Sequence, residues 1–100
     1  MARFDVHRSR RTDGSLLVIV QADMFNSLDT RLAIPLLPTR KGRTPLARLN
    51  PPVEISGEPY VVYTQHMLAV PVEQLGAPIA NIAEHRDDIV AAVDFLQQGF

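Results

Sequence analysis

Apolar and polar residues alternate in the first part of the chain in a way that predicts strands. Residues 3–8 place Phe4 and Val6 between polar neighbours, which is typical of a strand with one buried face. Residues 16–22 are apolar on both faces, so they should form a strand inside the sheet. The Asp13-Gly14 pair between these stretches favours a hairpin turn.

Residues 31–37 predict a third strand, which contains a proline. Pro35 has no backbone N–H to donate, so we expect an edge position or a bulge at this point. Residues 38–52 combine prolines, a glycine and charged side chains without a clear period. A loop this long within a small domain is often functional, and we expect at most one short turn of structure inside it.

A second hairpin and a further short strand are expected in the third quarter of the chain. Residues 53–55 and 60–65 are rich in β-branched and aromatic side chains and flank a turn that contains Gly57. A short strand should follow near Val70 and Val72, again interrupted by a proline.

The period changes near the end of the chain. Apolar residues now recur at spacings of three, four and seven, which is one face of an α-helix: Ile82, Ile89, Val93, Leu96 and Phe100. Asp87, Asp94 and Gln98 lie on the opposite face. Strands followed by one helix predict a single domain over residues 1–100, mostly β, with a small bent antiparallel sheet or barrel and one C-terminal helix.

Composition excludes several classes of protein. The chain has no cysteine, which removes disulfides and thiolate nucleophiles. No apolar run approaches the roughly 20 residues that span a bilayer. The first residues, MARFDVHRSRR, contain no apolar core of a secretory signal. We therefore expect a cytoplasmic protein that does not enter a membrane.

The net charge of −1 hides a strong asymmetry. Residues 1–50 carry nine Arg or Lys against four Asp or Glu, whereas residues 51–100 carry one against seven. The positive charges gather in a first basic cluster (Arg8, Arg10, Arg11) and a second basic cluster (Arg40, Lys41, Arg43). Such clusters bind phosphates or an acidic peptide, or they are simply solvated loops.

No catalytic or metal-binding arrangement emerges from the motifs. His7, His66 and His85 fall in three separate predicted elements without metal-ligand spacing, so each is expected at the surface. The five glycines form no phosphate-binding loop. We expect no cofactor, and the motifs by themselves indicate no enzyme.

Four short stretches carry a resemblance to a known family. VQAD (residues 20–23), TRLAIPL (30–36), VPV (70–72) and the final HRDDI…QGF are similar, in order and spacing, to the CcdB toxins of type II toxin–antitoxin modules. The resemblance implies a homodimer with an SH3-like, mostly antiparallel β fold and a C-terminal helix. This fold is similar to that of the MazF and Kid ribonuclease toxins.

The resemblance also implies a function and partners. CcdB-like proteins are not enzymes; they poison DNA gyrase by binding its A subunit and trapping the cleaved DNA complex. A CcdA-like antitoxin neutralises them with a disordered acidic tail. The antitoxin also recruits the toxin to operator DNA, so that the complex represses its own operon.

Carried over to this chain, the gyrase-binding residues are Met24, Phe25, Asp94, Gln98, Gly99 and Phe100. The family usually ends in Trp-Gly-Ile, so Gly99 matches, Phe100 replaces an aliphatic residue and Gln98 replaces the tryptophan. Because tryptophan is a typical interface hot spot, Gln98 weakens the case for gyrase poisoning. A core position for Phe25 is an equally open interpretation.

The antitoxin-binding residues implied by the resemblance are the two basic clusters: Arg8, Arg10, Arg11, Arg40, Lys41 and Arg43. Two alternative functions stay open. In the first, the chain is a non-toxic or weakened relative that binds only its antitoxin. In the second, it is a ribonuclease toxin on the same fold. A ribonuclease would need a base and an oxyanion stabiliser, for which Arg31 or Arg40 with His66 are the candidates.

Overall fold

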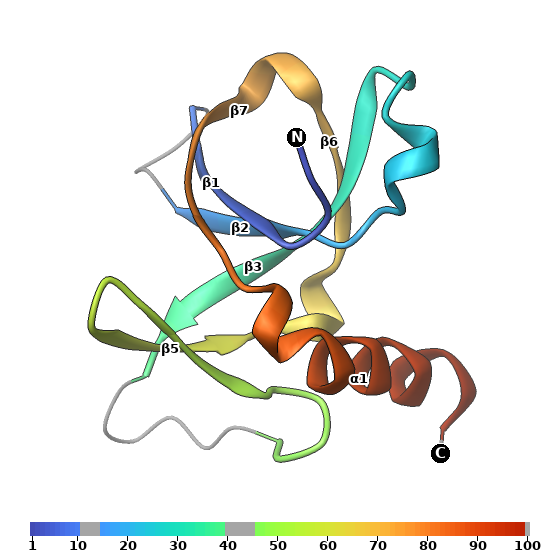
Figure 1. Ribbon diagram of the computed structural model, residues 1–100. Coiled ribbons are helices and arrows are strands. Elements are labelled where there is room, and N and C mark those ends of the chain that lie inside the picture. The colour runs from blue at the N-terminus through green and yellow to red at the C-terminus, as the bar shows by residue number, and fades with distance from the viewer. Residues whose placement is uncertain (11–14, 40–45, 100) are drawn as a thin grey trace.

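The computed structural model describes residues 1–10, 15–39 and 46–99, and its elements are labelled in Figure 1. The strands are β1 (Asp5–Ser9), β2 (Leu16–Ile19), β3 (Thr30–Pro38), β4 (Pro52–Ile55), β5 (Glu58–Val62), β6 (Leu68–Pro71) and β7 (Leu75–Asn81). Short 3₁₀ turns lie between them: η1 (Asp23–Phe25), η2 (Thr64–His66), η3 (Val72–Gln74) and η4 (Ala83–His85). The helix α1 (Arg86–Gln98) is the last element.

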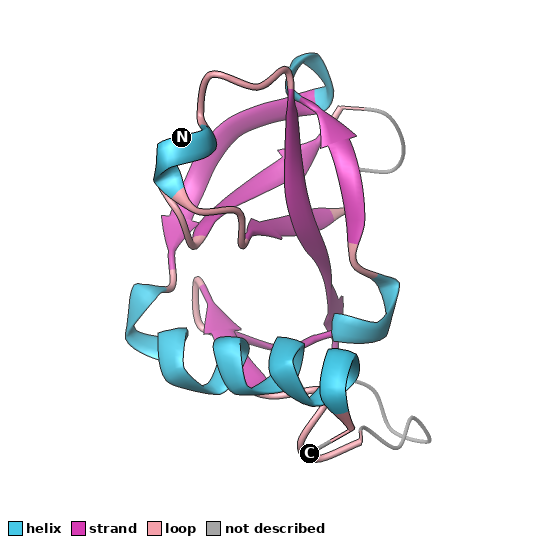
Figure 2. Ribbon diagram, turned by 90° about the vertical axis from the view of Figure 1, so that its right-hand side faces the viewer, coloured by secondary structure: helices cyan, strands magenta, loops and turns pink. Residues whose placement is uncertain are grey.

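One antiparallel sheet with a C-terminal helix confirms the predicted fold class. The strand order is β4-β5-β3-β2-β1-β7, and β6 pairs with β3 outside this path. The sheet bends so strongly that its two ends curl around a common interior, while α1 packs across one opening (Figures 1 and 2). The predicted interior strand is confirmed, since β2 is buried throughout and lies between β1 and β3.

Strand β3 lies in the middle of the sheet, so the expected edge position of Pro35 is wrong. One side of β3 pairs with β2, including the register pair Leu17 and Pro35. The other side changes partner, from β6 at Thr30–Ala33 to β5 at Leu36–Pro38. The Tyr63 N–H donates to the Pro35 carbonyl on that side. Because the N–H and C=O of a strand residue point the same way, the missing donor falls in the gap between the two partners.

The second hairpin is confirmed, and its turn is tighter than expected. Ile55 pairs with Glu58, which leaves only Ser56 and Gly57 in the loop. Both have positive φ angles, 53° and 82°, as a type I′ turn requires. The predicted Asp13-Gly14 turn lies outside the described residues, and the strands on either side of it, β1 and β2, pair antiparallel.

Strand β7 was not expected from the sequence, and it contributes Leu75 to a second small core. It pairs with β1 along most of its length, with irregular register on both sides of His7. At Val72 the expected strand is wrong, because this residue begins η3 after β6 has ended. The backbones of β7 and β1 approach each other closely at Gly76, where a Cβ would lie 2.8 Å from the Arg8 carbonyl oxygen. This position therefore requires a glycine.

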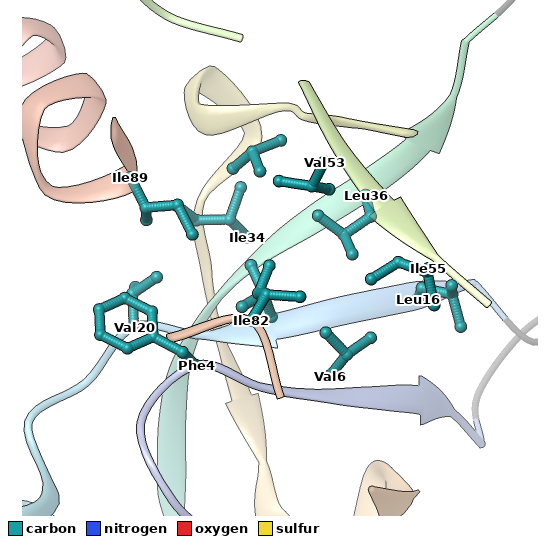
Figure 3. Close-up of a cluster of buried hydrophobic side chains, with 12 residues drawn as sticks. Phe4, Val6, Leu16, Val20, Ile34, Leu36, Val53, Ile55, Ile82 and Ile89 are labelled. Carbon is teal, nitrogen blue, oxygen red and sulfur yellow. The ribbon is translucent and has the colours of Figure 1, made fainter. Parts of the chain in front are cut away.

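The main core lies between the inner face of the sheet and α1. It joins residues from both ends of the chain, as Figure 3 shows: Phe4, Val6, Leu16, Val18, Val20, Ile34, Leu36, Val53, Ile55, Val62, Ile82 and Ile89. The helical stripe predicted from the sequence is buried at its first two positions. By Leu96 the stripe has become exposed, so α1 is anchored by its first half.

His7 is buried, which overturns its expected surface position. Its side chain is 1 % exposed, and Nδ1 lies 2.7 Å from the Gly76 carbonyl oxygen. The reason is β7, which pairs with the edge of β1 that faces away from β2 and brings Leu75 into a second small core with Leu17, the register partner of His7. The other two predicted surface histidines are exposed (His66) and partly exposed (His85).

Within the described residues, no helix has the length and apolar character that crossing a membrane requires.

Candidate functional site

The η1 loop, residues 23–29 between β2 and β3, presents apolar side chains to solvent. Met24 is 81 % exposed and Phe25 48 % exposed. Phe25 is therefore not a core residue, which decides the alternative that the sequence left open. Leu28, which the sequence did not single out, is 51 % exposed in the same loop.

Polar contacts from outside the η1 loop keep it in shape. The Arg3 N–H donates to Asp23 Oδ1 at 2.7 Å, and Asn26 Nδ2 donates to the Met1 carbonyl at 2.8 Å. Gln21 Nε2 lies within hydrogen-bonding distance of the Phe25 carbonyl, at 3.2 Å. The outward position of the apolar side chains is thus built into the surrounding structure.

The C-terminal half of α1 carries three more of the predicted gyrase-binding residues. Asp94 and Gln98 are four residues apart and exposed, so they share one helix face. Gly99 ends the helix in the left-handed conformation, with φ of 79°, and its N–H donates to the Phe95 carbonyl. Phe100 lies outside the described residues.

A small hollow lies between α1 and the residues that flank the η1 loop in the sheet. Its volume is about 120 Å³, and its lining includes Arg3, Leu32, Val90, Val93 and Asp94. One of its lining residues, Arg3, also donates its backbone N–H to Asp23 at the start of the η1 loop. Both segments lie on the right-hand side of the molecule in Figure 1, where the loop is cyan and the helix red.

The segment that follows the second basic cluster lies against α1. The Arg48 guanidinium lies 4.1 Å from the centre of the Phe95 ring, a cation–π contact. Buried Asn50 holds this segment in place: its Oδ1 accepts from the Leu46 N–H and its Nδ2 donates to Gln65 Oε1. The end of the long loop is therefore ordered and packed beside the helix.

The basic clusters are only partly within the described chain. Arg8 is exposed on β1, and Arg10 is exposed just after it, with its backbone N–H donating to the Gln74 carbonyl. Four of the predicted antitoxin-binding residues lie outside the described residues: Arg11, Arg40, Lys41 and Arg43. The ends of β1 and β2 nearest the first cluster lie at the left of Figure 1, away from the C-terminal end of α1.

The residues considered for ribonuclease chemistry are not assembled. The Arg31 side chain is 6 % exposed, and its guanidinium donates to backbone carbonyls of the η1 loop rather than facing a groove. His66 is exposed and packs edge-to-face on Tyr63, with ring centres 4.4 Å apart. Arg40 lies outside the described residues. Among those that are described, no three His, Cys, Asp or Glu side chains are grouped to hold a metal ion.

One carboxyl group near this surface has a shifted pKa. Burial of Asp5 opposes ionisation, but hydrogen bonds from the Asn81 side chain and the Ala2 N–H, with nearby positive charge, outweigh it and lower the pKa below 3.8. Asp5 thereby ties the N-terminal residues, which support the η1 loop, to the end of β7.

Solved structures of similar architecture are toxins. An endoribonuclease from a mycobacterial species, solved in complex with its cognate antitoxin, matches with a TM-score of 0.81 at 17 % identity, covering 100 % of this chain and 98 % of that one. The Mycobacterium tuberculosis toxin MazF-mt6 matches with a TM-score of 0.73 at 19 % identity, covering 90 % and 92 %. At this level of identity the likeness shows a shared fold, the antiparallel half-barrel with one C-terminal helix.

The family is shown by the sequence itself. Residues 3–99 match the family described as CcdB protein, which is nearly the whole chain and includes both the η1 loop and α1. The chain therefore belongs to the CcdB family, the toxins of type II toxin–antitoxin systems.

Proposed function

We propose that this protein poisons DNA gyrase, binding the A subunit and trapping the complex in which the DNA is cleaved. The match to the CcdB family over residues 3–99 is the observation that carries this proposal. The role is that of a non-enzymatic inhibitor, acting in the cytoplasm where gyrase and DNA are found.

The proposed gyrase-binding surface consists of Met24, Phe25, Asp94, Gln98, Gly99 and Phe100. Exposure of the first two supports it, because large exposed apolar side chains are typical anchors of protein interfaces. Gln98 buries less apolar area than the tryptophan usual in the family. The side chains of Met24 and Phe25 offset part of that loss.

We propose further that a CcdA-like antitoxin neutralises the protein through an acidic tail that binds Arg8, Arg10, Arg11, Arg40, Lys41 and Arg43. The excess of positive charge in residues 1–50 supports this role, since a disordered acidic segment gains affinity and association rate from such charge. The toxin would reach operator DNA only within the antitoxin complex.

The proposed active form is a homodimer. If two copies associate, dilution lowers the thermal unfolding midpoint, because dissociation favours unfolding at low concentration. Calorimetry over a hundredfold range of concentration measures this effect. A constant midpoint together with a monomeric mass throughout would contradict the dimer.

Ribonuclease activity is the second candidate, and one observation favours it: the structural neighbours include proteins named endoribonucleases. The environment of Arg31 argues against it. Its guanidinium is already used by three backbone carbonyls, so it is not available to stabilise an oxyanion near His66.

A cleavage assay tests the two candidates together. Purified protein is incubated with gyrase of the source organism, supercoiled plasmid and ATP, and in a parallel tube with messenger RNA. We expect linear DNA after detergent and protease, and its loss with Phe100→Ala or with deletion of residues 98–100. Cut RNA would instead support the ribonuclease, and intact DNA and RNA would indicate a relative that binds only its antitoxin.

A further inference from the structure

The η1 loop has an unusual construction. Three of its seven residues are large, apolar and largely exposed: Met24, Phe25 and Leu28. Left to itself, a short loop with this composition would turn its apolar side chains inward and reduce their contact with water. The surrounding structure therefore has to hold the loop in its outward-facing shape.

Buried Arg31 supplies much of that hold. Its Nη1 donates to the Leu28 carbonyl at 2.5 Å and to the Thr30 carbonyl at 2.9 Å, while Nη2 donates to the Asn26 carbonyl at 2.6 Å. Hydrogen bonds from a charged donor are roughly twice as strong as neutral ones. One side chain thus fixes the backbone at both ends of the segment that contains Leu28.

Arg31 has no acidic partner in the described part of the chain. No ion pair there includes it, and its Nε is buried without a hydrogen-bond partner. A buried cation costs free energy, and replacing buried charges by apolar side chains of similar size is often neutral or stabilising. If Arg31 served only to fill space opposite Val70 of β6, an apolar side chain would serve as well.

We propose that Arg31 is a positioning residue that holds the η1 loop in its binding shape, and that Leu28 is a third apolar contact beside Met24 and Phe25. The assignment of the partner as the gyrase A subunit rests on the proposed function. Holding the loop rigid before binding raises affinity, because the entropy of ordering it has already been lost in the free protein.

The test uses three variants of the full chain: Leu28→Ser, Arg31→Met and Arg31→Lys. Arg86→Met is the matched control, because Arg86 is an exposed arginine in the first turn of α1, outside the η1 loop. For each protein we measure affinity for the source organism's gyrase A subunit by calorimetry, hydrogen exchange of the amides of residues 26–30, and the urea unfolding midpoint.

We expect Leu28→Ser to weaken binding about tenfold with an unchanged urea midpoint, as loss of one interface contact does. Arg31→Met should weaken binding by at least as much and should accelerate amide exchange in residues 26–30. Arg31→Lys keeps the charge but cannot reach three carbonyls at once, so it should fall between wild type and Arg31→Met. The control should match wild type in all three measurements.

Several outcomes would overturn the proposal. The first is unchanged gyrase affinity in both Leu28→Ser and Arg31→Met while the wild-type protein binds. The second is that Leu28→Ser changes how the thermal unfolding midpoint depends on protein concentration and leaves gyrase affinity unchanged. The loop would then contact a second copy of the chain. If Arg31→Met does not fold, the affinities of Leu28→Ser and Arg31→Lys decide. Wild-type affinity for the gyrase A subunit in both variants would overturn the proposal.

Failure of the proposed function gives a different pattern. In that case the wild-type chain does not bind the gyrase A subunit, whereas hydrogen exchange still reports on Arg31. Faster exchange in Arg31→Met would support the positioning role for some other partner, and exchange equal to wild type would overturn it.

Discussion

The η1 loop and the C-terminal half of α1 lie on the same side of the molecule in Figure 1, but different interactions hold their backbones in place. The loop has little regular structure, and polar side chains from elsewhere hold its backbone, with Arg31 and Gln21 donating to its carbonyls. The helix holds its own backbone by internal hydrogen bonds, and residues 96–99 at its end are exposed. The loop therefore depends on side chains outside it to keep its apolar residues exposed. The helix end depends on the buried residues Ile89 and Ala92 earlier in α1.

The largest expected effect is the difference in stability between a change at the buried anchor of α1 and a change in the exposed η1 loop. Ile89 is fully buried in the main core, so Ile89→Ala should lower the free energy of unfolding by about 2–5 kcal/mol. Met24→Ala removes a side chain of similar size that is exposed, and its stability should stay within about 0.5 kcal/mol of wild type. Urea unfolding measures both, and equal losses would contradict the division.

A smaller effect is expected at the end of the helix. Gly99 has a φ of 79°, where a Cβ is strained, so Gly99→Ala should destabilise the helix terminus by about 1–2 kcal/mol even though nothing lies within 4 Å of the added Cβ. Faster exchange of the amides in the last helical turn would report this strain. Gln97→Ala, an exposed position within the helix, is the control and should not accelerate exchange.

The packing of the long loop against α1 should contribute still less. Arg48→Met removes the cation–π contact with Phe95, and the expected loss is about 0.5–1 kcal/mol. A double-mutant cycle with Phe95→Leu isolates the contact, because the two losses should not add. Fully additive losses would show that the stacked geometry contributes nothing.

The smallest expected effect depends on pH. The pKa of Asp5 is lower in the folded chain than its ordinary value of 3.8, so its carboxylate stabilises the fold above that value and loses the contribution as pH falls through the folded pKa. The stability difference between wild type and Asp5→Asn should therefore shrink as the pH falls from about 7 to about 3. Urea midpoints across this range measure it, and a constant difference would contradict the shift.

The sequence predicted well those elements whose own residue types indicate their structure. Residues 16–22 contain only apolar side chains up to Val20, so a central strand was the natural prediction. Gly57 identified the second hairpin because a tight turn requires positive φ. Strand β7 was missed because Gly76 and Pro78 give its sequence little β-propensity, and its pairing with β1 is what makes it a strand.

The candidate site shows the same limit. Exposure of Met24 and Phe25 was not decidable from the sequence, because an apolar residue after a strand is equally suited to a core. Burial of Arg31 was not predictable at all, since its partners are backbone carbonyls that carry no sequence signal. His7 was placed on the surface because nothing in residues 3–8 indicates that β7 will pair beside it and bring the Gly76 carbonyl to its ring.

The pairing of β1 with β7 has a consequence for the order in which the fold can form during synthesis. The first strand obtains its outer neighbour only after residues 75–81 have been made, and α1 closes the core later still. Contacts between such distant parts of the chain form slowly and together. While the chain is being made, β1 therefore lacks one of its two neighbours, and the core lacks Ile82 and Ile89, until these residues have been added.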